Sequence, residues 1–194
     1  MNEPSTSLSP LVTPAGALSP AGRVAAATAG LCAVGLAVYG ALSTAPPKAD
    51  YDSVCGNLRE VVFFAYLVGS ILGVAAMYRA GIATKRPTFM IGIGYGLVAL
   101  GVLAGFLLRE DPAWFFVVGG PGNLLALIGW IVFAVVTARS HRLPTWAAVL
   151  AGVGGVFAVL FADFGSGVLI GCFWLYLAPR TADQPATTGD VRAA

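Results

Sequence analysis

The sequence predicts an all-α fold: a polytopic transmembrane helical bundle of six spans, arranged as three helical hairpins with both termini on the cytoplasmic side. Three observations predict it. Of the 194 residues, 58% are hydrophobic and 10% are charged, whereas soluble domains carry roughly 25% charged residues. The apolar residues form long blocks separated by short charged segments, which is typical of a chain that crosses a bilayer repeatedly. Basic residues gather at alternate ends of these blocks, which orients the bundle.

Residues 1–22 are expected to form a disordered cytoplasmic tail, because Ser, Pro, Ala and Thr dominate and Glu3 is the only charged residue. The tail lacks the basic start of a cleavable signal peptide, and Arg23 directly precedes the first apolar block. That block is therefore expected to be an uncleaved anchor. Residues 23–179 then form one six-span transmembrane domain, and residues 180–194 form a second disordered cytoplasmic tail.

The expected spans are the apolar blocks at about 24–42, 61–78, 88–108, 122–138, 145–161 and 164–178. About 20 helical residues cross a hydrocarbon core of about 30 Å. The first three blocks meet this length, the fourth and fifth lie near the lower limit, and the sixth is short. One helix through both final blocks would exceed the bilayer thickness and place Asp163 near its middle, at a high energetic cost. Asp163 and the small residues after it instead favour a tight turn between two helices.

Charge distribution tests this topology independently, because short cytoplasmic loops are enriched in Lys and Arg. With six spans and the N-terminus inside, eight of the eleven basic residues fall on the inner side: Arg23, Arg79, Lys85, Arg86, Arg139, Arg142, Arg180 and Arg192. Lys48, Arg59 and Arg109 fall outside. The asymmetry favours cytoplasmic termini.

Two similar segments precede the third and fifth blocks. Residues 85–89 read Lys-Arg-Pro-Thr-Phe and residues 142–146 read Arg-Leu-Pro-Thr-Trp. Each contains a basic residue, a proline, a threonine expected to cap the next helix and an aromatic suited to the membrane interface. The likeness supports hairpins that enter from the cytoplasm, and both duplication and convergent loop chemistry explain it.

Glycines spaced four residues apart recur within the blocks. The pairs are Gly69 and Gly73, Gly92 and Gly96, Gly101 and Gly105, and Gly167 and Gly171. Small residues at this spacing let helix backbones approach closely in lipid. They are expected to pack helices within the bundle, or to form a face between copies of the chain.

Ionisable residues on the outer side are the first candidates for chemistry. Glu60 and Asp163 are the best candidate catalytic acids, with Asp111 as a third, because a desolvated carboxyl can hold a proton and act as a donor or a cation-coupling site. Solvated loop charges and local ion pairs are the simpler interpretation.

The segment after Asp111 is expected to form an interfacial or re-entrant loop. It carries aromatic residues and then the run Gly119-Gly120-Pro121-Gly122, which predicts a break before the fourth span. Asn123 is then the expected helix cap. The expected lining of a lipophilic substrate pocket is Arg59, Trp114, Phe115 and Asn123. An aromatic anchor at the interface explains the same residues.

The remaining candidates carry little chemistry. Cys32, Cys55 and Cys172 form no CxxC pair, so the sequence predicts neither a metal site nor a cofactor. Cys55 is expected to face the oxidising side without an intramolecular partner. The aromatic residues Trp130, Trp174, Tyr39, Tyr66 and Tyr176 suit both pocket lining and simple packing.

Two classes of function remain. No acidic pair for prenyl diphosphates, HExxH, nucleophile elbow or phosphate loop is present, and a net charge of +2 without a basic run excludes nucleic-acid binding. We favour a non-enzymatic bundle acting in transport, in the envelope or as a partner subunit. The alternative is a membrane-embedded enzyme acting on a lipophilic, isoprenoid-like substrate with Glu60 or Asp163 as general acid.

The expected partners and location follow from the same reading. The partners are the lipid bilayer, a lipophilic small molecule, and a second copy or another membrane protein. Arginine far outnumbers lysine, and alanine and glycine are abundant, which is typical of a GC-rich bacterial genome. The expected location is therefore the bacterial inner (plasma) membrane.

Overall fold

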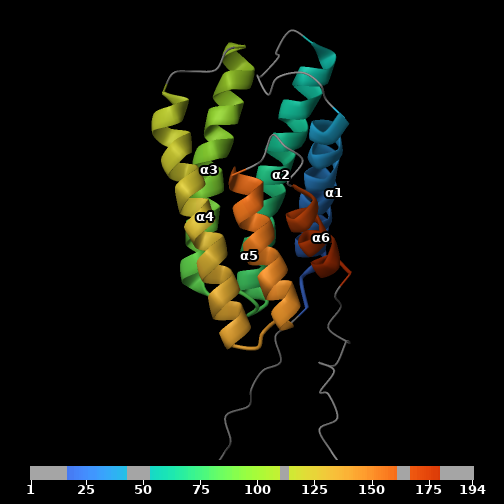
Figure 1. Cartoon of the computed structure of the whole chain (residues 1–194), viewed down its shortest axis with the longest axis vertical. Coiled ribbons are helices and arrows are strands. Elements are labelled where there is room, and N and C mark those ends of the chain that lie inside the picture. Colours follow the sequence, from blue (N-terminus) through green and yellow to red (C-terminus); the bar gives the residue numbers. More distant parts are fainter. Residues whose placement is uncertain (1–16, 43–52, 110–113, 161–166, 180–194) are drawn as a thin grey trace, which may run out of the picture.

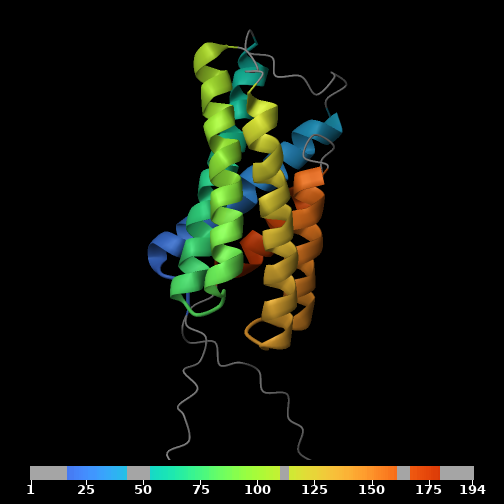
Figure 2. The same ribbon diagram turned by 90° about the vertical axis from the view of Figure 1, so that its left-hand side faces the viewer.

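The computed structural model describes residues 17–42, 53–109, 114–160 and 167–179. These residues form six helices: α1 (Pro20–Leu42), α2 (Val54–Arg79), α3 (Lys85–Leu108), α4 (Phe115–Arg139), α5 (Thr145–Leu160) and α6 (Gly167–Leu177). Figure 1 shows them as one bundle, and Figure 2 shows that α1 crosses the bundle obliquely while α2 to α5 run roughly along its long axis. The all-α prediction is confirmed. The expected tails at 1–16 and 180–194 lie outside the described residues.

The helices fall into two length classes. α1 to α4 have 23 to 26 residues and are long and apolar enough to cross a membrane. α5 has 16 residues and α6 has 11, which corresponds to about 24 and 16 Å against a hydrocarbon core of about 30 Å. At the end of the bundle where α3 ends and α4 begins, α5 and α6 stop short of the level that α3 and α4 reach (Figures 1 and 2). Four of the six expected spans therefore have the required length.

The six helices close into a ring. Each helix packs on the helices before and after it in sequence, and α6 packs back on α1. Glycines let most of these neighbours approach closely: a Cβ added at Gly69 would lie 3.0 Å from the backbone nitrogen of Ala29, and one at Gly154 would lie 2.7 Å from that of Ile170. The ring is narrow, so side chains alone fill its centre.

The first four helices begin earlier than their apolar blocks indicate, and the starts of α1 and α2 show one cause. α1 begins at Pro20, where the hydroxyl of Ser19 accepts a hydrogen bond from the backbone N–H of Gly22 at 3.1 Å. α2 begins at Val54, capped by Ser53, and includes seven residues that the sequence places before the second span. Polar and charged residues are tolerated in these first turns because the cap satisfies the free N–H groups. Residues 20–22 are therefore helical, and the tail prediction is wrong there.

Both expected threonine caps lie inside their helices. α3 begins at Lys85, so Thr88 lies inside the helix, and its hydroxyl donates to the carbonyl of Thr84 at 2.8 Å. α5 begins at Thr145 itself, and the carbonyl of Pro144 accepts from the N–H groups of Ala147 and Ala148. The prediction that these threonines cap their helices is therefore wrong; at α3 the reason is that proline at position 87 is tolerated in a first helical turn.

The glycine-rich segment of α4 is helical, which overturns the expected loop. α4 begins at Phe115 and continues through Pro121 and Asn123 to Arg139. Asn123 is therefore not a helix cap. The glycines serve helix contacts rather than a break: Gly119 accommodates the ring of Phe115, and a Cβ at Gly122 would lie 2.9 Å from the carbonyl oxygen of Gly94 on α3. Favourable packing against α3 outweighs the low helix propensity of the segment.

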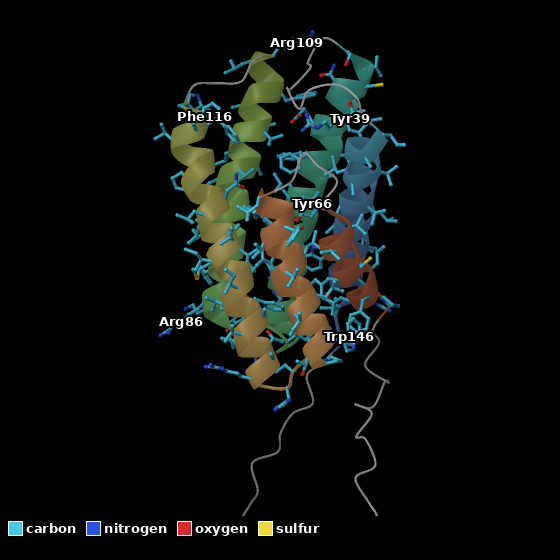
Figure 3. All side chains as sticks on the ribbon, viewed as in Figure 1. Tyr39, Tyr66, Arg86, Arg109, Phe116 and Trp146 are labelled. Carbon is cyan, nitrogen blue, oxygen red and sulfur yellow. The ribbon has the colours of Figure 1, made fainter. Side chains whose placement is uncertain are left out.

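The two ends of the bundle differ in charge. The turns that join α2 to α3 and α4 to α5 lie at one end, with Arg86 and Trp146 (Figure 3). There the guanidinium of Arg142 donates to the carbonyl oxygen of Gly81 at 2.8 Å, which ties the two turns together. Arg109, Tyr39 and Phe116 lie toward the opposite end (Figure 3). We call the first the inner end and the second the outer end, following the charge rule.

Candidate functional site

A cavity lies between the outer halves of α2 and α3. Its volume is about 160 Å³, and its lining comprises Glu60, Val61, Phe64, Val102, Leu103 and Phe106. The surface that these side chains present to the cavity is entirely apolar. Glu60 therefore contributes the methylene groups of its side chain to the wall, and the cavity suits hydrocarbon rather than a polar molecule.

Glu60 is the predicted site residue that the structure brings to a cavity. Glu60 is 8% exposed, and one of its carboxylate oxygens lies 3.8 Å from a guanidinium nitrogen of Arg59. Both residues lie in the second turn of α2 rather than at its head. A buried carboxyl is costly unless charged or hydrogen-bonding groups surround it, so this ion pair accounts for part of its tolerance within an apolar seam.

Farther from the outer end than the cavity, α2 and α3 are joined by a hydrogen bond between two buried side chains. The hydroxyl oxygens of Tyr66 on α2 and Tyr95 on α3 are 3.0 Å apart, and either can be the donor. The indole N–H of Trp130 on α4 donates to the Tyr95 oxygen at 2.9 Å. All three residues are buried, and Tyr66 lies midway along the bundle (Figure 3). Hydrogen bonds between buried side chains fix the relative positions of α2, α3 and α4.

Trp130 is also the hub of an aromatic cluster that fills the centre of the ring. Its ring makes edge contacts with Phe133 on its own helix and with Phe173 and Trp174 on α6, at centroid separations of 5.6 to 6.0 Å. It also covers Gly155 of α5. Such edge-to-face contacts are favourable. The centre is thus packed with side chains from α4 and α6.

The indole N–H of Trp174 on α6 is buried in this centre without a hydrogen-bond partner in the described part of the chain. Its ring lies against Gly73 of α2. An unpaired buried donor of this kind costs stability. The buried hydroxyl of Ser70, one helical turn after Tyr66 on α2, interacts with the Tyr66 hydroxyl.

The other predicted site residues are dispersed or lie outside the described residues. Asp111 and Asp163 are outside them, so their convergence with Glu60 stays a prediction. Trp114 directly precedes α4 and is 44% exposed. The ring of Phe115 packs against Gly101 and Gly119. Neither aromatic residue lines the Glu60 cavity, nor does Asn123, which lies partly buried within α4.

The cysteines are separate from one another. Cys32, Cys55 and Cys172 are free thiols, and Cys55 and Cys172 are exposed. Within residues 17–42, 53–109, 114–160 and 167–179, no three His, Cys, Asp or Glu side chains gather where they could hold a metal ion.

Sequence reasoning missed every lining residue of the cavity except Glu60, and it missed the role of Tyr95. The missed lining residues are Val61, Phe64, Val102, Leu103 and Phe106, and Tyr95 accepts the Trp130 hydrogen bond. Each is an ordinary apolar or aromatic residue within a span, and spacing on one helix does not reveal which neighbouring helix it meets. The available signal was the position of Tyr95 on the buried face of α3, opposite the exposed residues Ile93 and Leu100.

Comparison with protein-family models, with curated proteins and with solved structures gives no match for this chain.

Proposed function

We propose that the protein is a non-enzymatic, multi-pass component of the bacterial inner membrane, acting as a partner subunit or an envelope protein. The observation that carries this proposal is the filled centre of the ring. Trp130, Phe133, Phe173 and Trp174 are at most 1% exposed, and they occupy the position where a transporter would need a polar path. A sealed aromatic core supports a structural or partner role over conduction.

The proposed topology has cytoplasmic termini, four crossing helices and an α5–α6 pair that enters from the inner side and returns to it. The lengths of α5 and α6 support this arrangement. So does the gathering of Arg79, Lys85, Arg86, Arg139 and Arg142 at the two turns of the inner end.

Native Cys55 provides a test of this topology. It is exposed at the start of α2, at the proposed outer face. A membrane-impermeant maleimide added to intact cells is expected to label the wild-type chain and not the Cys55→Ser variant. A Cys55→Ser chain carrying Ser140→Cys, at the inner turn, is expected to react only after the cells are opened. Labelling of Ser140→Cys in intact cells would overturn the orientation.

The function is tested by complementation of a deletion strain, scored on growth under envelope stress. Glu60→Gln, Asp111→Asn and Asp163→Asn are expected to restore growth at normal membrane levels. Gly73→Leu is expected to fail, because a Cβ at Gly73 already lies 2.6 Å from the Trp174 ring. Gly92→Leu is the matched control, since nothing lies within 4 Å of a Cβ there.

A second candidate function is a membrane-embedded enzyme that acts on an isoprenoid-like substrate. The buried Glu60 beside an apolar cavity favours it, because general acids in apolar surroundings can retain a proton. In this case Glu60→Gln or Asp163→Asn abolishes complementation without lowering the membrane level. That result would contradict the non-enzymatic proposal.

A further inference from the structure

The cavity between α2 and α3 opens toward the bilayer. Three of its lining residues lie on the outer surface of the bundle: Val61 is 50% exposed, Leu103 41% and Phe106 40%. On the opposite wall, Glu60 and Val102 are at most 9% exposed. The opening therefore lies between side chains that face lipid, and the cavity ends at buried ones.

The size and the chemistry of the cavity define what it can hold. An engineered protein cavity of about 150 Å³ lined by apolar side chains stays dry and binds benzene or xenon. The volume here is about 160 Å³ and the wall is apolar. Water gains no hydrogen bonds from such a wall, whereas a hydrocarbon group of similar volume gains dispersion contacts with the side chains that line the space.

We propose that this cavity is a lateral binding site for the branched or cyclic apolar end of a membrane lipophile, entering from the bilayer between α2 and α3. The aromatic side chains of Phe64 and Phe106 contribute to the wall from the two helices. A group about one benzene ring in size fills the space that they leave. A straight acyl chain has less bulk at its end than a branched or cyclic group, so we expect it to make fewer contacts with this wall.

The neighbouring contacts keep the cavity in place. Tyr66 and Tyr95 fix the separation of α2 and α3 deeper in the same seam. The other side of α3 packs closely on α4 at the level of the cavity, where the ring of Phe115 lies against Gly101. Because α3 is held on both sides, its outer half cannot shift freely to fill the space. This inference does not depend on whether the protein is an enzyme.

Photolabelling tests the proposal on the full chain in lipid nanodiscs. Two probes are compared: a short prenol with a diazirine on its terminal isoprene unit, and a straight fatty acid with a diazirine at its chain end. Labelled positions are mapped by mass spectrometry. The prenol is expected to label Phe64, Val102 and Phe106 in preference to the lipid-facing Leu100, and more strongly than the fatty acid does.

Variants that fill the cavity with a larger side chain are compared with a variant at an exposed position outside it. Leu103→Trp is expected to reduce prenol labelling of Phe64 to the level of the lipid-facing surface. Leu100→Trp, at an exposed position of α3 outside the lining, is expected to leave it unchanged. Val61→Trp fills the cavity from α2 and replaces Leu103→Trp if that variant is not monodisperse.

Three results would overturn the proposal. They are equal labelling of the cavity and of Leu100, stronger labelling of the cavity by the straight fatty acid, and undiminished labelling in a folded cavity-filled variant. Each is independent of the complementation result, so failure of this inference is distinguishable from failure of the proposed function.

Discussion

The two sides of α3 are packed by different means. Toward α4, glycines bring the backbones together: a Cβ at Gly94 would lie 2.6 Å from the Gly122 carbonyl oxygen, and one at Gly129 would lie 2.9 Å from the backbone nitrogen of Ile91. Toward α2, the Tyr66–Tyr95 contact joins the helices, and a cavity remains beyond it. Backbone contact leaves no room for a ligand, whereas contact between large side chains leaves a cavity where they do not meet.

The largest expected effect comes from adding volume to the α3–α4 side. Gly94→Leu is expected to destabilise the fold by at least about 3 kcal/mol, because the new side chain would meet backbone atoms that cannot rotate away. The measurement is thermal unfolding followed by size-exclusion chromatography in detergent. Gly92→Leu, two residues earlier with open space around it, is the control and is expected to unfold as the wild type does. Equal loss in both variants would contradict backbone contact as the cause, because Gly92 has open space around it and leucine favours a helix more than glycine does.

The next largest loss of stability is expected at the hydrogen bonds that join Tyr66, Tyr95 and Trp130. Tyr95→Phe is expected to cost about 1 to 3 kcal/mol, because it leaves both the Trp130 N–H and the Tyr66 hydroxyl without this partner. Tyr66→Phe preserves the bond between Trp130 and Tyr95 and is expected to cost less. Thermal unfolding of the two single variants and of the double variant measures the coupling. A larger loss in Tyr66→Phe would contradict the assignment of Tyr95 as the centre of the network.

Features of the fold that depend on neighbouring residues in the sequence could be predicted, and features that depend on contacts between distant residues could not. The six helices and the inner turns follow from local apolar blocks and from charges such as Arg79 and Arg142. The start of α4 was missed because Gly119, Pro121 and Gly122 resemble a loop locally. Gly122 packs on Gly94 of the preceding helix, and no local pattern in the sequence reveals this contact.

The candidate site was predicted in part for the same reason. Glu60 was recognised because a carboxyl beside apolar sequence is unusual wherever it packs. Phe64, Val102 and Phe106 cannot be recognised in this way, since apolar residues cover both the exposed and the buried sides of these helices. In a membrane protein, hydrophobicity alone does not distinguish a pocket wall from a lipid contact.

A small gain in stability is expected when a larger side chain is placed in the cavity between α2 and α3. Val102→Leu extends into the cavity and is expected to stabilise the detergent-solubilised protein by about 0.5 to 1 kcal/mol. Val98→Leu, one turn deeper, is expected to destabilise it, because Val98 is 2% exposed and packs near Gly122. Unfolding temperatures of the two variants separate these cases. A loss of stability in Val102→Leu would contradict free space at the α2–α3 cavity, whereas Val98 packs near Gly122 of α4 and is expected to lose stability in either case.

The smallest effect is expected at the inner end, where the turn from Ala80 to Thr84 already closes the α2–α3 seam. Arg142→Gln removes the hydrogen bond to the Gly81 carbonyl, which lies at an exposed position. Water replaces the lost donor, so the expected cost is below about 0.5 kcal/mol. Arg86→Gln removes an equal charge from the same end and is the control in the unfolding measurement. A substantially larger loss in Arg142→Gln than in Arg86→Gln would mean that the bond between the two turns, rather than helix packing alone, holds the inner end together.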